Sequence, residues 1–112
     1  MSQALGGLRS WLLQRATAVY LAGFAVYVAV ALAATPPPDL AAWRAWVLAP
    51  PRAIATALFF IALLAHAWVG VRDVALDYVR PAELRLTVLA VVALALLAQG
   101  LWVARILLVT GP

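Results

Sequence analysis

Three long stretches without a formally charged side chain constrain this chain more than any other feature of its sequence. They cover residues 16–38, 53–71 and 86–104, and His66 is the single histidine within them. At about 1.5 Å of rise per residue, even the two shorter stretches reach about 29 Å, which matches a hydrocarbon core of about 30 Å. They lack the apolar/polar alternation of barrel strands, so helices must satisfy their backbone in lipid. The predicted fold class is therefore an all-α integral membrane protein with three transmembrane helices.

Prolines and interfacial residues set the expected limits of these helices. Pro36, Pro37 and Pro38 stop the first helix, and Asp39 then caps a short interfacial segment. The transmembrane helices are predicted at about 14–34, 51–77 and 83–109, and the interfacial segment at about 40–48. These elements fill nearly the whole chain, so residues 1–112 are predicted to form a single membrane-anchor domain with no separate catalytic domain.

The first apolar run also has some features of a secretory signal. Basic residues precede it, and Ala31, Leu32 and Ala33 have the small-x-small form of a cleavage site. The run is longer than the usual signal core of about 7 to 15 residues, and two further spans follow. We therefore expect this segment to remain in the membrane.

Composition excludes several functions. Hydrophobic residues make up 68% of the chain, and cysteine is absent, which rules out disulfides and iron–sulfur ligation by this chain. The net charge of +4 comes from eight arginines, which flank the spans and do not gather on one face, so nucleic-acid binding is not expected. Five arginines fall on the N-terminal side of the predicted membrane and three on the other, which favours a cytoplasmic N-terminus.

One polar stripe interrupts the apolar chain, along the segment 66–81, HAWVGVRDVALDYVRP. In a helix with about 100° per residue, Gly70, Asp73 and Asp77 lie within roughly 40° of His66. His66 is then about 16 Å deeper along the helix axis than Asp77. The stripe would join the interior of the membrane to its surface.

His66 has two interpretations. An imidazole in mid-membrane can form an interhelical hydrogen bond, or it can bind haem iron while a neighbouring acceptor holds its other nitrogen. Gly70 would let a flat macrocycle approach the backbone, or it marks a close helix contact. The chain has one histidine, and Met1 is unsuitably placed, so a second imidazole ligand would have to come from another polypeptide.

Other polar residues are open to two interpretations as well. Asp77 and Tyr78 together offer a proton source and a hydrogen-bond donor suited to a quinone carbonyl, or they form a polar helix end in an aromatic belt. Arg15 either extends to the membrane surface or meets an anionic group such as a haem propionate. Arg72 and Asp73 fit an interfacial ion pair, or extended side chains at a helix end. Gln99 is predicted to form an interhelical hydrogen bond.

Two motifs resemble a known family. His-Ala-Trp-Val-Gly at 66–70, followed by Asp-Tyr-Val-Arg-Pro at 77–81, resembles the H-A-W-x-G and D-Y-V-[KR]-P signature of the smaller hydrophobic membrane anchor subunit of succinate dehydrogenase, complex II. Arg-Ala-Thr-Ala at 15–18 resembles the R-A-T-A start of that family. The three-span layout agrees, so the resemblance covers nearly the whole chain.

The resemblance implies a partner, cofactors and residue roles. The chain would pack with a second three-helix anchor of the cytochrome b556 type, share one haem b with it, and hold a flavoprotein and an iron–sulfur subunit on the bacterial inner membrane. It would be non-catalytic in isolation, and would help pass electrons to ubiquinone in the tricarboxylic acid cycle and respiratory chain. His66 would be the haem iron ligand and Arg15 would lie near the propionates. Tyr78 would bind the quinone, with Asp77 supporting that site or delivering protons.

The sequence leaves two alternatives open. One is a b-type cytochrome subunit of another quinone-linked oxidoreductase, such as fumarate reductase. The other is a small structural or transport protein, although the first span lacks the buried carboxylate that a proton-coupled exporter would need.

Overall fold

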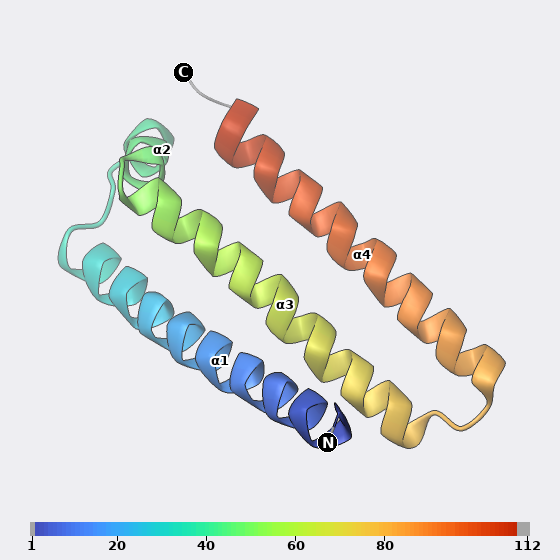
Figure 1. The fold of residues 1–112 in the computed structure, drawn as a ribbon. Helices are drawn as coiled ribbons and strands as arrows, with labels where there is room; N and C mark the ends of the chain where they lie inside the picture. The colour runs from blue at the N-terminus through green and yellow to red at the C-terminus, as the bar shows by residue number, and fades with distance from the viewer. Residues whose placement is uncertain (1, 110–112) are drawn as a thin grey trace.

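The chain forms four helices, of which three are long (Figure 1). The structure is a computed structural model that describes the backbone of residues 2–109 and the side chains of residues 7–109. The helices are α1 (Ser2–Ala34), α2 (Leu40–Leu48), α3 (Arg52–Tyr78) and α4 (Ala82–Val109). All regular secondary structure in the described part of the chain is helical, which confirms the predicted fold class.

Three of these helices are long and apolar enough to cross a membrane. The candidate spans are Gly7–Ala34, Arg52–Tyr78 and Ala82–Val109. The longest dimension of the molecule is 51 Å, somewhat more than a bilayer with its headgroup regions, at about 40–45 Å. The structure therefore supports a multi-pass membrane protein.

The long helices lie side by side in a single layer, with α3 in the centre (Figure 1). α1 packs along one side of α3 and α4 along the other, and each runs antiparallel to α3. α2 packs against the beginning of α3, at the end of the layer that is remote from the α3–α4 loop. A layer of this kind leaves two broad faces without a covering helix from residues 2–109.

Burial within this layer is sparse. Of the described side chains, Thr17, Val69 and Ala75 are buried, and many large apolar side chains are exposed. Gln99 is also exposed, and it makes no hydrogen bond to residues 7–109, so the predicted interhelical bond is not formed within this part of the chain. A polar side chain within a span is costly in lipid, which offers it no hydrogen-bond partner.

α1 is longer than the sequence suggested. It begins at Ser2, whereas the span was predicted to begin near residue 14. No proline occurs between these positions, and the two glycines at 6 and 7 cost only about 1 kcal/mol each relative to alanine, so the helix continues through them. Arg15 therefore lies inside α1 and not at its start.

The turn between α1 and α3 follows the predicted proline and cap signals. Asp39 caps α2, because one of its carboxylate oxygens accepts a hydrogen bond from the amide of Ala42 at 2.8 Å. Trp43 and Trp46 stack with their ring centroids 5.9 Å apart. Arg52 lies 4.2 Å above the Trp46 ring and donates to the Trp46 carbonyl at 2.7 Å. These contacts hold α2 against the start of α3.

Candidate functional site

Small and polar side chains line the face of α1 that meets α3. Ser10, Gln14 and Thr17 are four and three residues apart, which places them on one face of a helix. Their partners on α3 follow in the reverse order along the sequence. Ser10 contacts Arg72, Gln14 contacts Gly70, and Thr17 contacts His66. This antiparallel register brings the polar stripe of α3 against a polar stripe of α1.

His66 is held by a hydrogen bond between the two helices. Its Nδ1 lies 2.9 Å from the Thr17 hydroxyl oxygen. That hydroxyl also lies 2.6 Å from the carbonyl oxygen of Leu13 and 3.2 Å from that of Gln14. Thr17 is 8% exposed, whereas the His66 residue is half-buried. The interhelical hydrogen bond expected as one interpretation of His66 is therefore present, and it occupies only one of the two ring nitrogens.

Gly70 lies against Gln14 in this interface. A Cβ built on Gly70 would lie 3.5 Å from Gln14 Nε2, an ordinary van der Waals distance. The bare backbone of Gly70 thus faces α1, as expected for a close helix contact. The Gln14 Oε1 atom is buried and has no hydrogen-bond partner among the described residues.

The surroundings of His66 are compatible with its serving as the one haem iron ligand that this chain provides. Its Nε2 makes no hydrogen bond to any group of residues 7–109, so that nitrogen keeps its bonding capacity. An open groove of about 350 Å³ adjoins Thr17 between α1 and α3, and the small side chains of Ala16, Ala62 and Ala65 line part of it, whereas His66 is not among its lining residues. No cluster of three or more His, Cys, Asp or Glu side chains occurs among the described residues. This chain can therefore offer an iron atom one imidazole from the site.

Arg15 does not meet His66 in the chain. It is exposed, and its guanidinium lies 5.6 Å from the centroid of the Trp11 ring. Arg15 is two positions before Thr17, so about 200° of helical rotation separates them and they lie on nearly opposite faces of α1. The long side chain of Arg15 extends away from the interface with α3.

Asp77 and Tyr78 lie at the opposite end of the polar stripe, in the last turn of α3. Both are exposed, and Tyr78 is 76% exposed. Neither side chain makes a hydrogen bond or an ion pair with residues 7–109. Tyr78 follows His66 by twelve positions, about 18 Å of helix rise. The two predicted sites are therefore separate in this chain.

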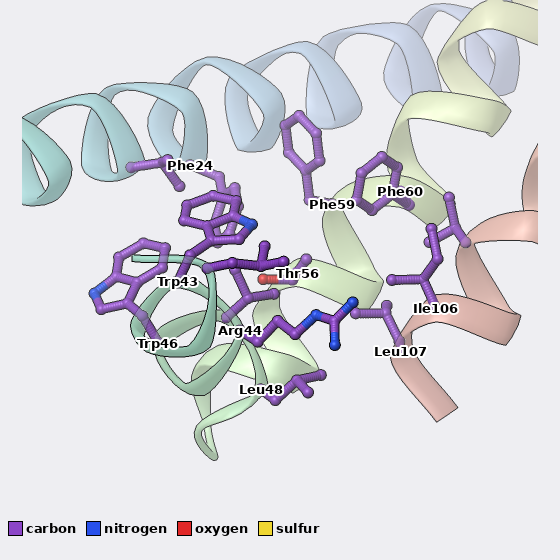
Figure 2. Close-up of a pocket in the computed structure, with 14 residues that line it drawn as sticks. Phe24, Trp43, Arg44, Trp46, Leu48, Thr56, Phe59, Phe60, Ile106 and Leu107 are labelled. Atoms are coloured by element: carbon purple, nitrogen blue, oxygen red, sulfur yellow. The ribbon is translucent and has the colours of Figure 1, made fainter. Parts of the chain in front are cut away.

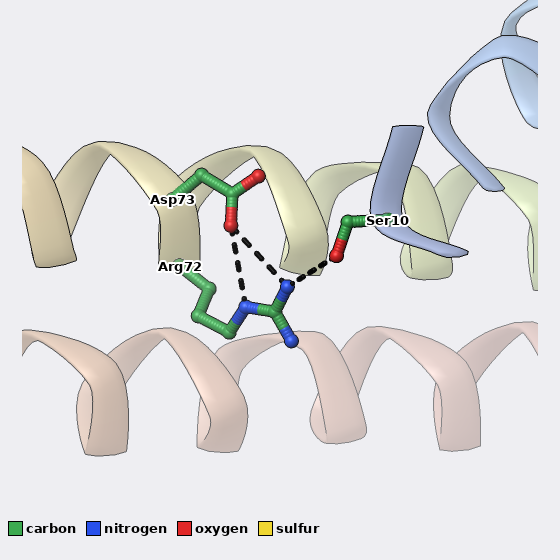
Figure 3. A network of polar contacts seen from close by, with 3 residues as sticks. All are labelled: Ser10, Arg72 and Asp73. Carbon is green, nitrogen blue, oxygen red and sulfur yellow. Dashed lines mark hydrogen bonds and ion pairs between the residues drawn. The ribbon is translucent and has the colours of Figure 1, made fainter. Parts of the chain in front are cut away.

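A small polar network lies along α3 between His66 and Tyr78, and consists of Ser10, Arg72 and Asp73 (Figure 3). Arg72 Nη2 donates to the Ser10 hydroxyl at 2.9 Å and lies 3.3 Å from Asp73 Oδ1. Arg72 and Asp73 thus form the predicted ion pair, with side chains 35% and 48% exposed. Because both are partly in solvent, their attraction adds little to stability, and the contact with Ser10 connects α1 to α3.

A cavity that was not predicted lies at the other end of the layer, beside α2 (Figure 2). Its volume is about 510 Å³, and aromatic side chains from three helices line it, among them Phe24, Trp43 and Phe59. Arg44 is the charged residue in its lining. Neither His66 nor Tyr78 contributes to this cavity.

Sequence reasoning missed Thr17 and Ser10 as partners of the polar stripe. The spacing of Ser10, Gln14 and Thr17 was a usable signal, because three polar residues on one face of an apolar helix need a protein neighbour. The cavity beside α2 had no comparable signal, since its lining comes from all four helices.

Comparison with known proteins agrees with this arrangement. The profile of the family described as "Succinate dehydrogenase/Fumarate reductase transmembrane subunit" matches residues 3–102. The chain is 32% identical over 101 residues to the protein named "Succinate dehydrogenase hydrophobic membrane anchor subunit" of Coxiella burnetii (strain RSA 493 / Nine Mile phase I). That match covers 90% of this chain and 88% of the relative. With three membrane spans and a family match over most of its length, the chain belongs to the succinate dehydrogenase/fumarate reductase transmembrane subunit family.

Proposed function

We propose that this chain is the smaller membrane anchor of a succinate:quinone oxidoreductase. It packs in the bacterial inner membrane beside a second three-helix anchor, with its N-terminus in the cytoplasm. Together the two anchors hold a flavoprotein subunit and an iron–sulfur subunit, which carry out succinate oxidation. The anchor itself contributes to the site where electrons reach ubiquinone. The family match and the name of the Coxiella relative support this assignment.

The observation that carries the cofactor part of the proposal is the state of His66. It lies in the middle of a candidate span, one ring nitrogen is held by Thr17, and the other makes no bond to the described residues. A bound haem b would supply a one-electron carrier at this depth. His66 would bind its iron through Nε2, and the partner anchor would provide the second imidazole. Arg15 would pair with a propionate only if its long side chain turned back around α1, because it lies on nearly the opposite face of that helix from Thr17.

The quinone part of the proposal depends on Tyr78 and Asp77. Reduction of a quinone to a quinol takes up two electrons and two protons. The Tyr78 phenol would donate a hydrogen bond to one quinone carbonyl, which polarises that carbonyl toward reduction. The Asp77 carboxylate, exposed beside it at the cytoplasmic end of α3, would pass protons from water. Both side chains are exposed and make no hydrogen bond or ion pair with residues 7–109, which leaves their polar groups available to a quinone or to a partner subunit.

Replacing Tyr78 with phenylalanine tests this role. The variant keeps the ring and removes the donor, so we expect quinone reduction by the assembled complex to fall about tenfold, the equivalent of about 1.4 kcal/mol. Succinate oxidation with a soluble dye as electron acceptor should persist, because it does not use the membrane site. Both activities are measured on the same purified complex.

The matched control is Tyr27→Phe, which removes a phenol hydroxyl beside Arg52, the first residue of α3, whereas Tyr78 is the last. It should leave both activities near those of the unmodified complex. Equal loss of the two activities in the Tyr78 variant would show that the substitution disturbs assembly, and would count against a role in quinone binding.

Fumarate reductase is the second candidate, because the matching family covers the membrane subunits of both enzymes. The two assignments differ in the soluble subunits that accompany the anchor and in the favoured direction of turnover. The complex can be purified by a tag on this chain. Its rates of succinate oxidation and of quinol-linked fumarate reduction then distinguish the two assignments.

A further inference from the structure

The Thr17 hydroxyl is surrounded by three groups that compete for one proton. It lies 2.6 Å from the Leu13 carbonyl oxygen, 3.2 Å from the Gln14 carbonyl oxygen and 2.9 Å from His66 Nδ1. A carbonyl oxygen can only accept a hydrogen bond, whereas an imidazole nitrogen donates or accepts according to the tautomer. The assignment of the proton therefore also determines the state of the imidazole.

The distances decide where the proton lies. Two oxygens at 2.6 Å need a hydrogen between them, because 2.5–3.0 Å is the usual range for an O–H···O bond and without the proton their lone pairs would repel. The Leu13 carbonyl brings no proton of its own, so the hydroxyl must donate to it. Thr17 then has only lone pairs left for His66, and His66 Nδ1 must carry the hydrogen of the 2.9 Å bond.

We infer that Thr17 is a positioning residue that holds His66 in the Nδ1–H tautomer and so presents the unprotonated Nε2 to the haem iron. This inference deepens the proposed function and rests on His66 being the ligand. The backbone of α1 sets the direction of the hydroxyl through the bond to Leu13, and the hydroxyl in turn sets the tautomer and the ring plane of His66 on α3. Hydrogen bonds of this kind to the outer nitrogen also raise the basicity of a metal-bound imidazole.

The surroundings of Thr17 favour this role over that of an incidental contact. It is 8% exposed, so bulk water is not at hand to replace it as the acceptor. A threonine in a helix holds few rotamers, and bonding of its hydroxyl to the carbonyl four residues earlier selects one of them. The acceptor is therefore fixed in place before any cofactor is bound.

The first test determines the tautomer of His66 in the full chain, without haem. His66 is the single histidine of the sequence, so 15N-histidine labelling of the chain in lipid bilayers gives the ring signals of one residue. We expect a protonated Nδ1 and an unprotonated Nε2 in the unmodified chain and in Thr17→Ser, which keeps the hydroxyl. Thr17→Val has nearly the same shape without the acceptor, and should lose this preference. A protonated Nε2 in the unmodified chain would overturn the inference.

The second test measures haem in the complex co-expressed with its partner subunits. Thr17→Val should weaken haem affinity roughly ten- to hundredfold, as is typical when an outer partner of a metal ligand is removed. It should also raise the haem midpoint potential, because a less basic imidazole stabilises ferric iron less. Thr17→Ser should stay near the unmodified complex in both measurements.

The outcomes separate this inference from the proposed function. Loss of haem from His66→Ala, together with unchanged affinity and potential in Thr17→Val, would uphold the ligand and overturn the role of Thr17. Unchanged haem in His66→Ala would overturn the ligand assignment and, with it, the role of Thr17 toward iron. If Thr17→Val fails to assemble, the tautomer of the unmodified chain still decides the inference.

Discussion

At the scale of single residues, Tyr20 shows how a hydroxyl is kept within an apolar interface. It donates a hydrogen bond from α1 to the Ala55 carbonyl of α3 at 2.6 Å, and its ring stacks near Phe24. Tyr20→Phe removes this bond alone. We expect the free energy of unfolding to fall by about 0.6 kcal/mol, and by at most about 1.7, as measured for interhelical bonds in membranes. The change is measured by unfolding the chain in mixed micelles with an increasing fraction of a denaturing detergent.

Tyr27→Phe is the control for this measurement. The Tyr27 hydroxyl accepts from Arg52 at 3.0 Å in an exposed position, and Arg52 keeps its bond to the Trp46 carbonyl when that hydroxyl is removed. Its loss should therefore cost less than the loss of the Tyr20 hydroxyl. Equal effects of the two substitutions would contradict a specific contribution from the bond to Ala55.

At the scale of helices, the packing of α4 on α3 depends on Gly100. A Cβ built there would lie 3.1 Å from Leu64 Cδ1, which is tighter than most real contacts. The flexible end of Leu64 can shift to accept one methyl group, so Gly100→Ala should be tolerated. Gly100→Val adds a branched side chain that would move α4 away from α3, and we expect a loss of about 1–3 kcal/mol in the same unfolding measurement.

Gly23 on α1 provides the matched control, because a Cβ there would meet nothing within 4 Å. Gly23→Val carries the same change in helix propensity without the collision. If both valine variants lost stability equally, helix propensity and not packing would explain the effect at Gly100.

At the scale of the whole molecule, the single layer of three long helices leaves several polar groups without hydrogen-bond partners among the described residues. His66 Nε2, Gln14 Oε1 and the exposed Gln99 lack partners among the described residues, while many large apolar side chains are exposed. We therefore expect a tagged form of this chain, purified in mild detergent, to carry with it a second membrane subunit, an iron–sulfur subunit and a flavoprotein. A reduced-minus-oxidised spectrum of the same material should show haem b.

His66→Ala sharpens this experiment. The variant should still bring the partner subunits with it, because helix packing and not the ring supplies most of the interface, but the haem spectrum should be lost. Recovery of the unmodified chain without other subunits would argue against its role as an anchor.

Much of the architecture could be predicted from local features. The three spans follow from the length and apolarity of uncharged runs, and the position of α2 follows from the prolines and from Asp39, whose cap is formed as expected. The start of α1 could not be predicted in this way, because the change from an interfacial to a membrane environment near Arg15 does not interrupt a helix that has no proline there.

The sequence by itself determined the class of the protein, the polar stripe from His66 to Asp77 with Tyr78 beside its end, and the need for another polypeptide to complete a two-histidine site. These depend on composition, short-range spacing and the number of histidines. Only the tertiary structure decided that Thr17 holds His66, that Gly70 faces Gln14, and that Arg15 points away from both. Thr17 and His66 are 49 residues apart in the chain. Their contact arises from the antiparallel register of α1 on α3, which is set by packing along the whole interface. The polar face of α1 indicates a protein neighbour, but neither segment alone shows which residue of α3 Thr17 meets.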